Sequence, residues 1–552
     1  MDIKKSSGLI FHPTSLPGKH GIGNFGKNAK TFVDYLVETN TKIWQVLPLG
    51  LTDEIEYSPY SSPSSVLGNI NLIDLDNLNI QSEFTLEENK FPSEFIDFKN
   101  VYKYKSDALY NISKSIDVNE NYYQKFLNNK LIREHITFLT LNKINQNPWF
   151  SWNETEKSYS ENLFEYVSNK YEEEFKYNLF TQYEFTRQWE ELKQYANKSG
   201  IKMLGDIPIY VNHNSADVWS SNNLFELDNT GNMSYVSGAV PDEFTADGQV
   251  WNTTLYDWDI NREENYQYWI NKLKSNLDKV DYLRIDHFVG FFQYWAIPIK
   301  ESALNGSWRK GPWKTFFEEV SKVIPMSKLV AEDLGVVLSE TEEILRKYNI
   351  PGMKVLQQRI PSDIKHDEIH PNEWKENLIA YTGTHDSPTI KQWFGESNEV
   401  QIEYFNKYKQ ELNFNLNNDV WDFISLVWES PAQVSVTTVQ DLLELDKEVE
   451  LKIVDLALSH IKKVEANPDV VTDGDNFDYW NSCPLSDGTF VDYNIHESNL
   501  GTASDEEGYV NEWHCSAYHV DPPSEETDHH QINTDIEKYI FTYIDGEITY
   551  ID

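Results

Sequence analysis

Cysteine is almost absent from this chain of 552 residues, which holds only Cys483 and Cys515. Two thiols cannot form a disulfide framework in so long a chain, and such low cysteine usage is typical of a reducing compartment. No apolar run approaches the roughly 20 residues that a membrane span needs. The apolar stretch near the N-terminus is about three residues long, short of the roughly 7 that a secretory signal needs. We therefore expect a cytoplasmic protein with no membrane segment.

Positive charge is also scarce, since 47 lysines and arginines stand against 89 acidic residues, for a net charge of -42 at pH 7. Binding to a phosphate backbone needs a basic face, so this balance argues against nucleic acid as a partner. It also disfavours anionic membranes and anionic substrates, whereas a neutral substrate such as a sugar fits. Aromatic residues make up 14% of the chain and include 17 tryptophans. They allow stacking surfaces for sugar rings, although we expect most of them in the core.

Eight short apolar runs rich in β-branched residues recur along the chain, and each ends in polar or charged residues. Continuous apolar runs are typical of parallel strands that are covered on both faces. Helical stretches separate most of them, so the pattern predicts an α/β fold, the (β/α)8 or TIM barrel. The helix after the fifth run is expected to begin with a capping box, because Ser339 and Glu342 have S-x-x-E spacing. The runs begin at Gly8, Lys42, Ile201, Asp281, Lys328, Gly352, Leu378 and Ser435.

The spacing of these runs is uneven and predicts how the chain is divided. Residues 76–199, between the second and third runs, have helical periods and predict a helical insertion subdomain. Residues 212–258, between the third and fourth, are rich in Gly, Asn, Asp and Trp and predict a long loop over the active site. The catalytic barrel would then span 1–464. The strongly acidic segment 465–552 keeps aromatic residues and alternation, so we expect an appended β-rich module of unassigned role.

Three predicted strands end in acidic residues, which are Asp286 on the fourth, Glu332 on the fifth and Asp386 on the seventh. Catalytic groups of barrel enzymes come from the C-terminal ends of strands. Glycoside cleavage needs one ionised and one protonated carboxyl group, and neighbouring strands can supply both. Arg284 lies two residues before Asp286, so the two side chains share a face and the guanidinium can keep the carboxylate ionised. A single such acid more often caps a helix or pairs with a lysine, but three together favour catalysis.

Nine peptides occur in an order that makes the sequence recognisable: GLIFHPTSLPGKHGIGNFG, WQVLPLG, SPY, GDIPIYV, LRIDHFVGF, AEDLG, PGMKVLQ, YTGTHD and VQDLL. They extend from Gly8 to about Leu445. In these peptides the chain resembles the 4-α-glucanotransferases, also called amylomaltases or disproportionating enzymes, of glycoside hydrolase family 77. It departs from the family pattern in THDSPT, where the family usually reads THDNDT, and in WNTT, where it reads WGNP.

The resemblance implies a role for each of the three acids. Asp286 corresponds to the nucleophile, Glu332 to the general acid/base, and Asp386 to a third carboxylate that stabilises the transition state. The substrate-binding residues that it implies are Arg284, His287, His385, Asp206, Tyr60, Ser58 and Trp251.

The implied reaction is the transfer of a segment of an α-1,4-glucan or malto-oligosaccharide to the 4-hydroxyl of an acceptor glucose or glucan, by a retaining double displacement. No metal or organic cofactor is expected, because the His and Cys residues near His514 and Cys515 match no zinc pattern. The residues make no prediction of oligomeric state. Two alternatives stay open at this point. One is an α-glucan hydrolase on the same scaffold, and the other is a catalytically impaired glucan-binding or regulatory relative, which the altered motifs would suit.

Overall fold

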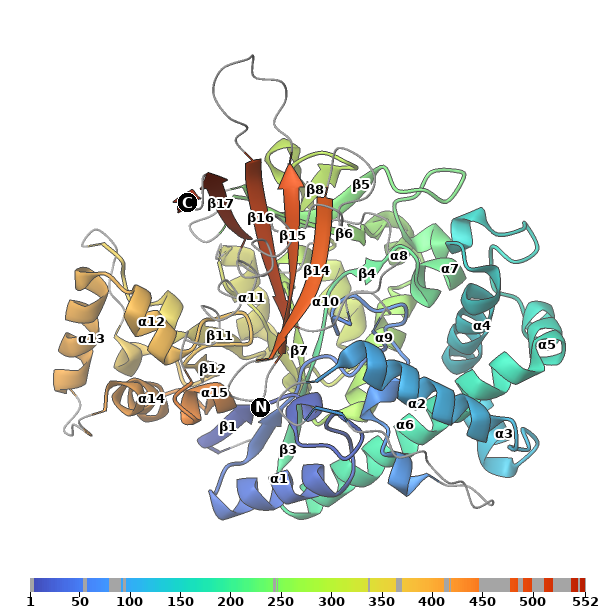
Figure 1. Cartoon of the computed structure of the whole chain (residues 1–552), viewed down its shortest axis with the longest axis horizontal. Coiled ribbons are helices and arrows are strands. Elements are labelled where there is room, and N and C mark those ends of the chain that lie inside the picture. Colours follow the sequence, from blue (N-terminus) through green and yellow to red (C-terminus); the bar gives the residue numbers. More distant parts are fainter. Residues whose placement is uncertain are drawn as a thin grey trace.

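Eight parallel strands form the centre of the molecule (Figure 1). The computed structural model describes residues 4–52, 57–78, 91–92, 96–241, 245, 247–335, 338–363, 370–411, 416 and 418–445, and the backbone of five strands between 477 and 551. The order of the eight strands is β10-β7-β3-β2-β1-β13-β12-β11. The N–H of Ala331 donates to the carbonyl of Pro351 at 2.9 Å and links the two ends of this order. The predicted (β/α)8 barrel and all eight predicted strands are confirmed. Their bounds are β1 Ser6–Ile10, β2 Ile43–Gln45, β3 Lys202–Ile207, β7 Tyr282–Ile285, β10 Leu329–Ala331, β11 Gly352–Val355, β12 Leu378–Tyr381 and β13 Val434–Thr438.

The strands form a barrel because their apolar residues are buried on both faces. The inward side chains of all eight strands make one cluster, as branched residues do in a packed barrel interior. The outward side chains pack against helices. In α1 (Lys27–Glu38), Ala29, Val33 and Leu36 recur at helical spacing and are fully buried, which gives that helix one apolar stripe. The inward cluster consists of Ile10, Ile43, Leu204, Tyr282, Val330, Met353, Val355, Ile379, Tyr381, Val434 and Val436.

The predicted capping box at Ser339 is wrong. Helix α11 (Ser339–Tyr348) begins at Ser339 itself, and its N-cap residue is Leu338, which makes no side-chain cap. The Ser339 hydroxyl donates instead to the carboxylate of its neighbour Glu340 at 2.8 Å. The helix therefore begins one residue earlier than the S-x-x-E spacing requires, so Ser339 is its first residue and not its N-cap.

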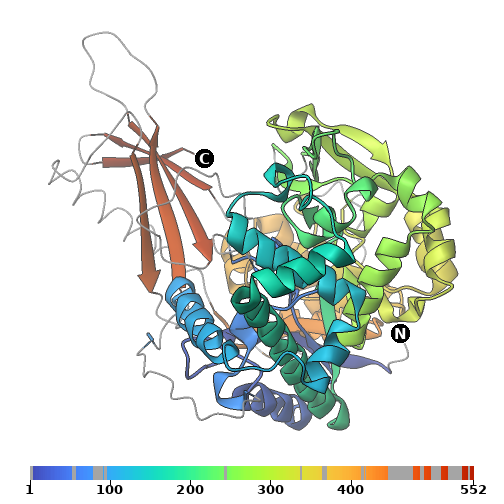
Figure 2. The same cartoon turned by 90° about the vertical axis from the view of Figure 1, so that its right-hand side faces the viewer.

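Helices α2 to α6 fill the long interval between β2 and β3, and they form the side of the molecule that faces the viewer in Figure 2. The last of them also belongs to the barrel wall, because the indole of Trp189 on α6 donates to the carbonyl of Lys279 at 2.7 Å. The segment predicted as an insertion therefore ends in a helix of the barrel itself. The bounds are α2 Phe98–Ser113, α3 Asn121–Leu127, α4 Lys130–Asn145, α5 Glu161–Lys170 and α6 Glu172–Lys198.

A second sheet, antiparallel and five-stranded, has the order β4-β6-β5-β8-β9. The predicted loop 212–258 thus contains two strands of a sheet, and its irregular appearance in sequence comes from short strands and the Gly238 bulge. The strand β8, which pairs with β5, comes from the segment after β7, and local sequence pattern does not reveal this pairing. The strands are β4 Val211–Asn212, β5 Tyr235–Ala239, β6 Gln249–Thr254, β8 Gln293–Pro298 and β9 Ser307–Lys310. Helices α7 Ala216–Ser220, α8 Trp258–Glu263, α9 Gln267–Lys279 and α10 Lys314–Val320 accompany them.

Helices α12 Ile390–Glu396, α13 Glu399–Glu411, α14 Asp419–Glu429 and α15 Val439–Leu442 complete the barrel on the side opposite α3 to α5 (Figure 1). A third sheet follows in the segment 465–552, with five antiparallel strands in chain order. Among the described strands these pair only with one another. They are β14 Phe477–Pro484, β15 Phe490–Ser498, β16 Asn511–His519, β17 Lys538–Ile544 and β18 Glu547–Ile551. In the part of the chain that is described, no helix has both the length and the apolar character to cross a membrane.

Candidate active site

Asp286 lies directly after β7, at the rim of the barrel. Its backbone N–H donates to the carbonyl of Ile207 at 3.0 Å, which continues the β7–β3 pairing by one residue. Alternation along the strand places Tyr282, Arg284 and Asp286 on the inward face. The Asp286 side chain is 33% exposed, so one face of the carboxylate is open to a ligand.

The Arg284 guanidinium lies between two carboxylates. One terminal nitrogen is 2.6 Å from Asp206 and the other is 2.8 Å from Asp286, while Nε donates to the sulfur of Met353 at 3.4 Å. Burial alone would lower the pKa of Arg284, but the charges of Asp206 and Asp286 outweigh it and raise the pKa well above its usual value. The group is thus a permanent cation that stabilises the negative charge of Asp286, as a carboxylate nucleophile requires.

Glu332 follows β10, the neighbour of β7. Its Oε2 accepts the backbone N–H of His287 at 2.8 Å, and its Oε1 accepts that of Leu334 at 2.9 Å. These two bonds fix the orientation of the carboxyl group beside Asp286. Burial first, and the charge of Asp286 second, raise the pKa of Glu332 to about 7. A carboxyl group with this pKa carries a proton in much of the protein at neutral pH and can act as a general acid.

His287 directly follows Asp286 in the chain and contacts Glu332 through its backbone. Its φ of 48° places it in the left-handed region, which turns the backbone so that its N–H reaches Glu332. Burial lowers the pKa of His287 to about 4, so the ring is neutral at pH 7. The ring of Trp251, from β6 of the second sheet, lies perpendicular to it at 4.8 Å between centroids, and Tyr210 contacts both rings. The second sheet therefore supplies an aromatic wall to the site.

The third carboxylate, Asp386, begins a chain of polar contacts that crosses the barrel rim. His385 Nε2 lies 3.2 Å from Asp386 Oδ1 and 2.7 Å from the Tyr60 hydroxyl, and the Tyr60 and His385 rings stack at 5.3 Å. The Tyr60 hydroxyl donates a hydrogen bond to Asp206 at 2.8 Å, so it accepts the hydrogen bond that it shares with His385. Asp206 in turn accepts a hydrogen bond from Arg284, which also contacts Asp286, so this series of polar contacts connects Asp386 with Asp286. The Asp386 side chain is 54% exposed, which leaves it open to a ligand.

Ser58 is the one predicted site residue that the structure places outside this set of contacts. Its hydroxyl accepts the backbone N–H of Tyr60 at 3.3 Å, and its carbonyl accepts that of Ser61 at 3.2 Å. Ser58 shapes the turn that presents Tyr60 to Asp206. The other nine predicted residues come together at the C-terminal ends of β3, β7, β10 and β12, with Tyr60 from the connection after β2 and Trp251 from β6.

Two polar residues at this rim were missed from the sequence. His12 follows β1, and burial, followed by the charge of His385, lowers its pKa to about 3. Gln357 follows β11, and its amide donates to the carbonyl of Pro388 at 2.9 Å. Both are polar residues at strand ends, and a search that included neutral side chains would have found them. Within the described residues four buried atoms here have no hydrogen-bond partner, and a ligand rich in hydroxyl groups suits such a rim. They are His12 Nδ1, Asp206 Oδ1, Gln357 Oε1 and His385 Nδ1.

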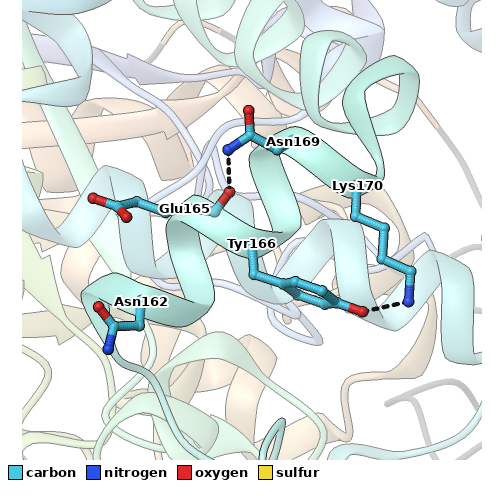
Figure 3. A pocket seen from close by; sticks show the side chains of 5 residues that line it. All are labelled: Asn162, Glu165, Tyr166, Asn169 and Lys170. Carbon is cyan, nitrogen blue, oxygen red and sulfur yellow. Dashed lines mark hydrogen bonds between the residues drawn. The ribbon is translucent and has the colours of Figure 1, made fainter.

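A separate shallow hollow lies on the surface of α5 and is lined by Asn162, Glu165, Tyr166, Asn169 and Lys170 (Figure 3). Some of its polar groups bond within the helix, since Lys170 donates to the Tyr166 hydroxyl and Asn169 donates to the carbonyl of Glu165. All its residues come from one helix, far from the strand ends in sequence, and none is placed for catalysis. Among the residues whose side chains are described, no group of three or more His, Cys, Asp or Glu could hold a metal ion.

Comparison with known proteins shows which family the chain is similar to. A family profile described as 4-alpha-glucanotransferase matches residues 11–452. The 4-alpha-glucanotransferase of Clostridium butyricum is 38% identical over 456 residues, which cover 80% of this chain and 92% of the relative. That of Aquifex aeolicus is 34% identical over 456 residues, covering 81% and 92%. The structure of an amylomaltase from Streptococcus agalactiae in complex with acarbose superposes with a TM-score of 0.74 at 32% identity, covering 81% of this chain and 92% of that one.

Proposed function

The chain belongs to the 4-alpha-glucanotransferase family, glycoside hydrolase family 77, and from this premise we propose that Asp286, Glu332 and Asp386 carry out its transfer reaction. The enzyme moves a segment of an α-1,4-glucan to the 4-hydroxyl of an acceptor glucose or glucan by a retaining double displacement. The arrangement of Arg284, Asp286 and Glu332 supports this assignment most strongly. In this arrangement the carboxylate of Asp286 lies beside a permanent cation, and the pKa of the neighbouring Glu332 is raised to about 7.

The first displacement uses the two carboxyl groups in opposite protonation states. Glu332 gives its proton to the oxygen of the scissile bond, while Asp286 attacks the anomeric carbon from the other face and forms a glycosyl ester. Positive charge develops on the sugar ring in the transition state, and Asp386 lies open to the cleft to stabilise it. The leaving part of the glucan departs with a free 4-hydroxyl.

The second displacement runs the same steps in reverse. Glu332, now ionised, takes the proton from the 4-hydroxyl of the acceptor, whose oxygen attacks the ester carbon and releases Asp286. Transfer exceeds hydrolysis only when a sugar displaces water from the acceptor position. The ring of Trp251 beside His287 offers an apolar surface for that sugar.

The test is an incubation of the purified protein with maltotriose. Transfer yields glucose together with oligosaccharides longer than maltotriose. Hydrolysis yields only shorter products, and a glucan-binding relative yields none. Either of the last two results would refute the proposed activity.

We also propose the division of the chain into a catalytic barrel of residues 1–464 and a module of residues 465–552. The pairing of β14 to β18 among themselves supports a separate module. Within the barrel, we propose that the segments 76–199 and 212–258 wall the cleft. A cytoplasmic location is likewise our proposal, supported by the low cysteine content and tested by cell fractionation.

A further inference from the structure

Asp386 stands in a connection without regular structure, residues 382–389, between β12 and α12. Its sequence, THDSPT, is the place where the chain departs from the family pattern. The connection has bonds of its own, since Ser387 Oγ accepts the N–H of Thr384 at 3.0 Å and Thr384 Oγ1 accepts the N–H of Asp386 at 3.2 Å. These short-range bonds shape a turn, but they do not fix it to the barrel.

The carboxylate of Asp441 holds both ends of this connection. Asp441 follows β13, in the peptide VQDLL, and is only 1% exposed. Its Oδ2 accepts the hydroxyl of Thr382 at 3.0 Å, at the end of β12. Its Oδ1 accepts the backbone N–H of Ile390 at 2.8 Å, at the start of α12. The buried carboxylate of Asp441 therefore connects Thr382 and Ile390, and His385 and Asp386 lie between these two residues in the chain.

Asp441 is itself fixed. The Thr438 hydroxyl accepts the backbone N–H of Asp441 at 3.1 Å as the N-cap of α15, and β13 is paired on both sides, with β1 and with β12. Burial raises the pKa of Asp441, against the effect of the bonds from Ile390 and Thr382. A buried carboxyl group lowers stability unless its partners are in place, and an apolar residue would fill this space at less cost. The acid at this position is therefore better explained by what it holds than by stability.

Two further contacts act on the second half of the connection. The Thr389 hydroxyl donates to the carbonyl of Leu445 at 2.9 Å, and the Gln357 amide donates to the carbonyl of Pro388 at 2.9 Å. Among the described residues, Asp441 alone holds both the first and the last residue of the stretch from Thr382 to Ile390.

We propose that Asp441 is a positioning residue for the transfer reaction, because its two oxygens clamp Thr382 and Ile390 and so set the place of Asp386 against the reacting sugar. This inference rests on the proposed function, in which Asp386 stabilises the transition state. A shift of about 1 Å in such a group lowers the rate about a hundredfold without removing any catalytic atom. The clamp acts on kcat, since the ground-state contacts of the glucan with the rest of the cleft remain.

The test is a double-mutant cycle between Asp441 and Asp386, with kcat and KM measured on maltotriose. Asp441→Ala is expected to lower kcat at least about tenfold with KM changed less than about threefold. In an Asp386→Asn background the same change is expected to lower kcat further by no more than about twofold, because Asp441 acts through Asp386. A full tenfold loss in both backgrounds, or an Asp441→Ala enzyme within twofold of wild type, would overturn the inference.

Two further variants protect the test against loss of folding. Thr382→Val removes one clamp bond and is expected to lower kcat several-fold, while Asp441→Asn keeps an oxygen for Ile390 and is expected to lie between wild type and Asp441→Ala. The matched control is Ser435→Ala on β13, which removes a buried bond to the carbonyl of Val427 (3.0 Å) without touching the connection. It is expected to lower the melting temperature and leave kcat unchanged. Equal kcat losses in Ser435→Ala and Thr382→Val would reject positioning.

The outcomes also separate this inference from the proposed function. If Asp386→Asn retains wild-type transfer, the proposed role of Asp386 is rejected, and the positioning role of Asp441 is rejected with it. If Asp386→Asn is inactive while Asp441→Ala is fully active, only the clamp is rejected.

Discussion

The backbone N–H of His287 donates to Glu332 Oε2 at 2.8 Å, so the residue that follows Asp286 holds the carboxyl group of Glu332. A second bond runs between the same two segments, from the N–H of Phe288 to the carbonyl of Glu332 at 3.1 Å. The segments that carry Asp286 and Glu332, the two proposed catalytic groups, are thereby linked by one bond between backbone groups and one from a backbone N–H to the Glu332 carboxylate. Their separation is set by the pairing of β7 with β10, which are adjacent strands of the barrel.

The pKa of Glu332 predicts the alkaline limit of activity. Glu332 must be protonated to give its proton to the leaving oxygen, and a group with a pKa of about 7 loses that proton as the pH rises. We expect kcat/KM for maltotriose to fall about tenfold for each pH unit above about 7. A profile that stays flat from about pH 6 to about pH 9 would contradict the assignment.

The same shift predicts a pH-dependent gain in stability for Glu332→Gln. The folded-state pKa of Glu332 lies above its ordinary value of 4.5, so the folded protein binds more protons than the unfolded chain between that value and about 7. Stability is therefore lost as the pH rises through this window. The glutamine variant has no such loss, and its melting temperature should exceed that of the wild type by more at pH 8 than at pH 5. An equal difference in melting temperature at both pH values would show that burial does not raise the pKa of Glu332.

Arg284→Met should destabilise the protein strongly because Asp206, which is 1% exposed, would lose its cation. Removing one partner of a buried ion pair typically costs about 3 to 5 kcal/mol of unfolding free energy. Chemical denaturation of both proteins measures the loss. The control is Lys19→Met, which breaks the exposed pair with Asp76 at 3.0 Å and should leave the midpoint unchanged. Similar midpoints for all three proteins would mean that the Arg284 pair does not hold the rim together.

A chain that ends at residue 464 should keep transfer activity and remain monodisperse. The strands of the third sheet pair with no strand of the barrel in the described backbone, so their removal breaks no barrel pairing. Size-exclusion chromatography and the maltotriose assay check both expectations. Aggregation of the shortened chain would instead show that residues 465–552 cover apolar barrel surface.

The barrel could be predicted because its signal is local. Each strand is a short apolar run between turns, and the polar residue after each run marks the catalytic rim, as with Asp286 after Ile285. The second sheet could not be predicted in this way. Strands β5 and β6 are short and contain Gly238 and Asn252, and β5 pairs with β8 from beyond the next barrel strand.

The charged residues of the site could be predicted from the sequence. The acids and their Arg and His neighbours stand at strand ends, and the family resemblance gives them roles. The predicted roles themselves stay predictions, although the structure brings these side chains together. A residue such as Gln357 can be found by its place after a strand, but the sequence does not show which groups it contacts. Gln357 donates one hydrogen bond to a carbonyl, and Asp441 accepts two hydrogen bonds. Such contacts exist only once the chain has folded.

The most direct test of the account is to trap the covalent intermediate on the Glu332→Gln enzyme. Maltotriosyl fluoride needs little acid assistance to form the glycosyl ester, but without Glu332 as base the acceptor attacks slowly and the ester accumulates. Peptide mapping by mass spectrometry after rapid acid quenching should place the maltotriosyl group on Asp286, and Asp286→Asn in the same background should remove it. A maltotriosyl group on Asp386, or an unlabelled protein that still consumes the fluoride at the same rate, would contradict the account.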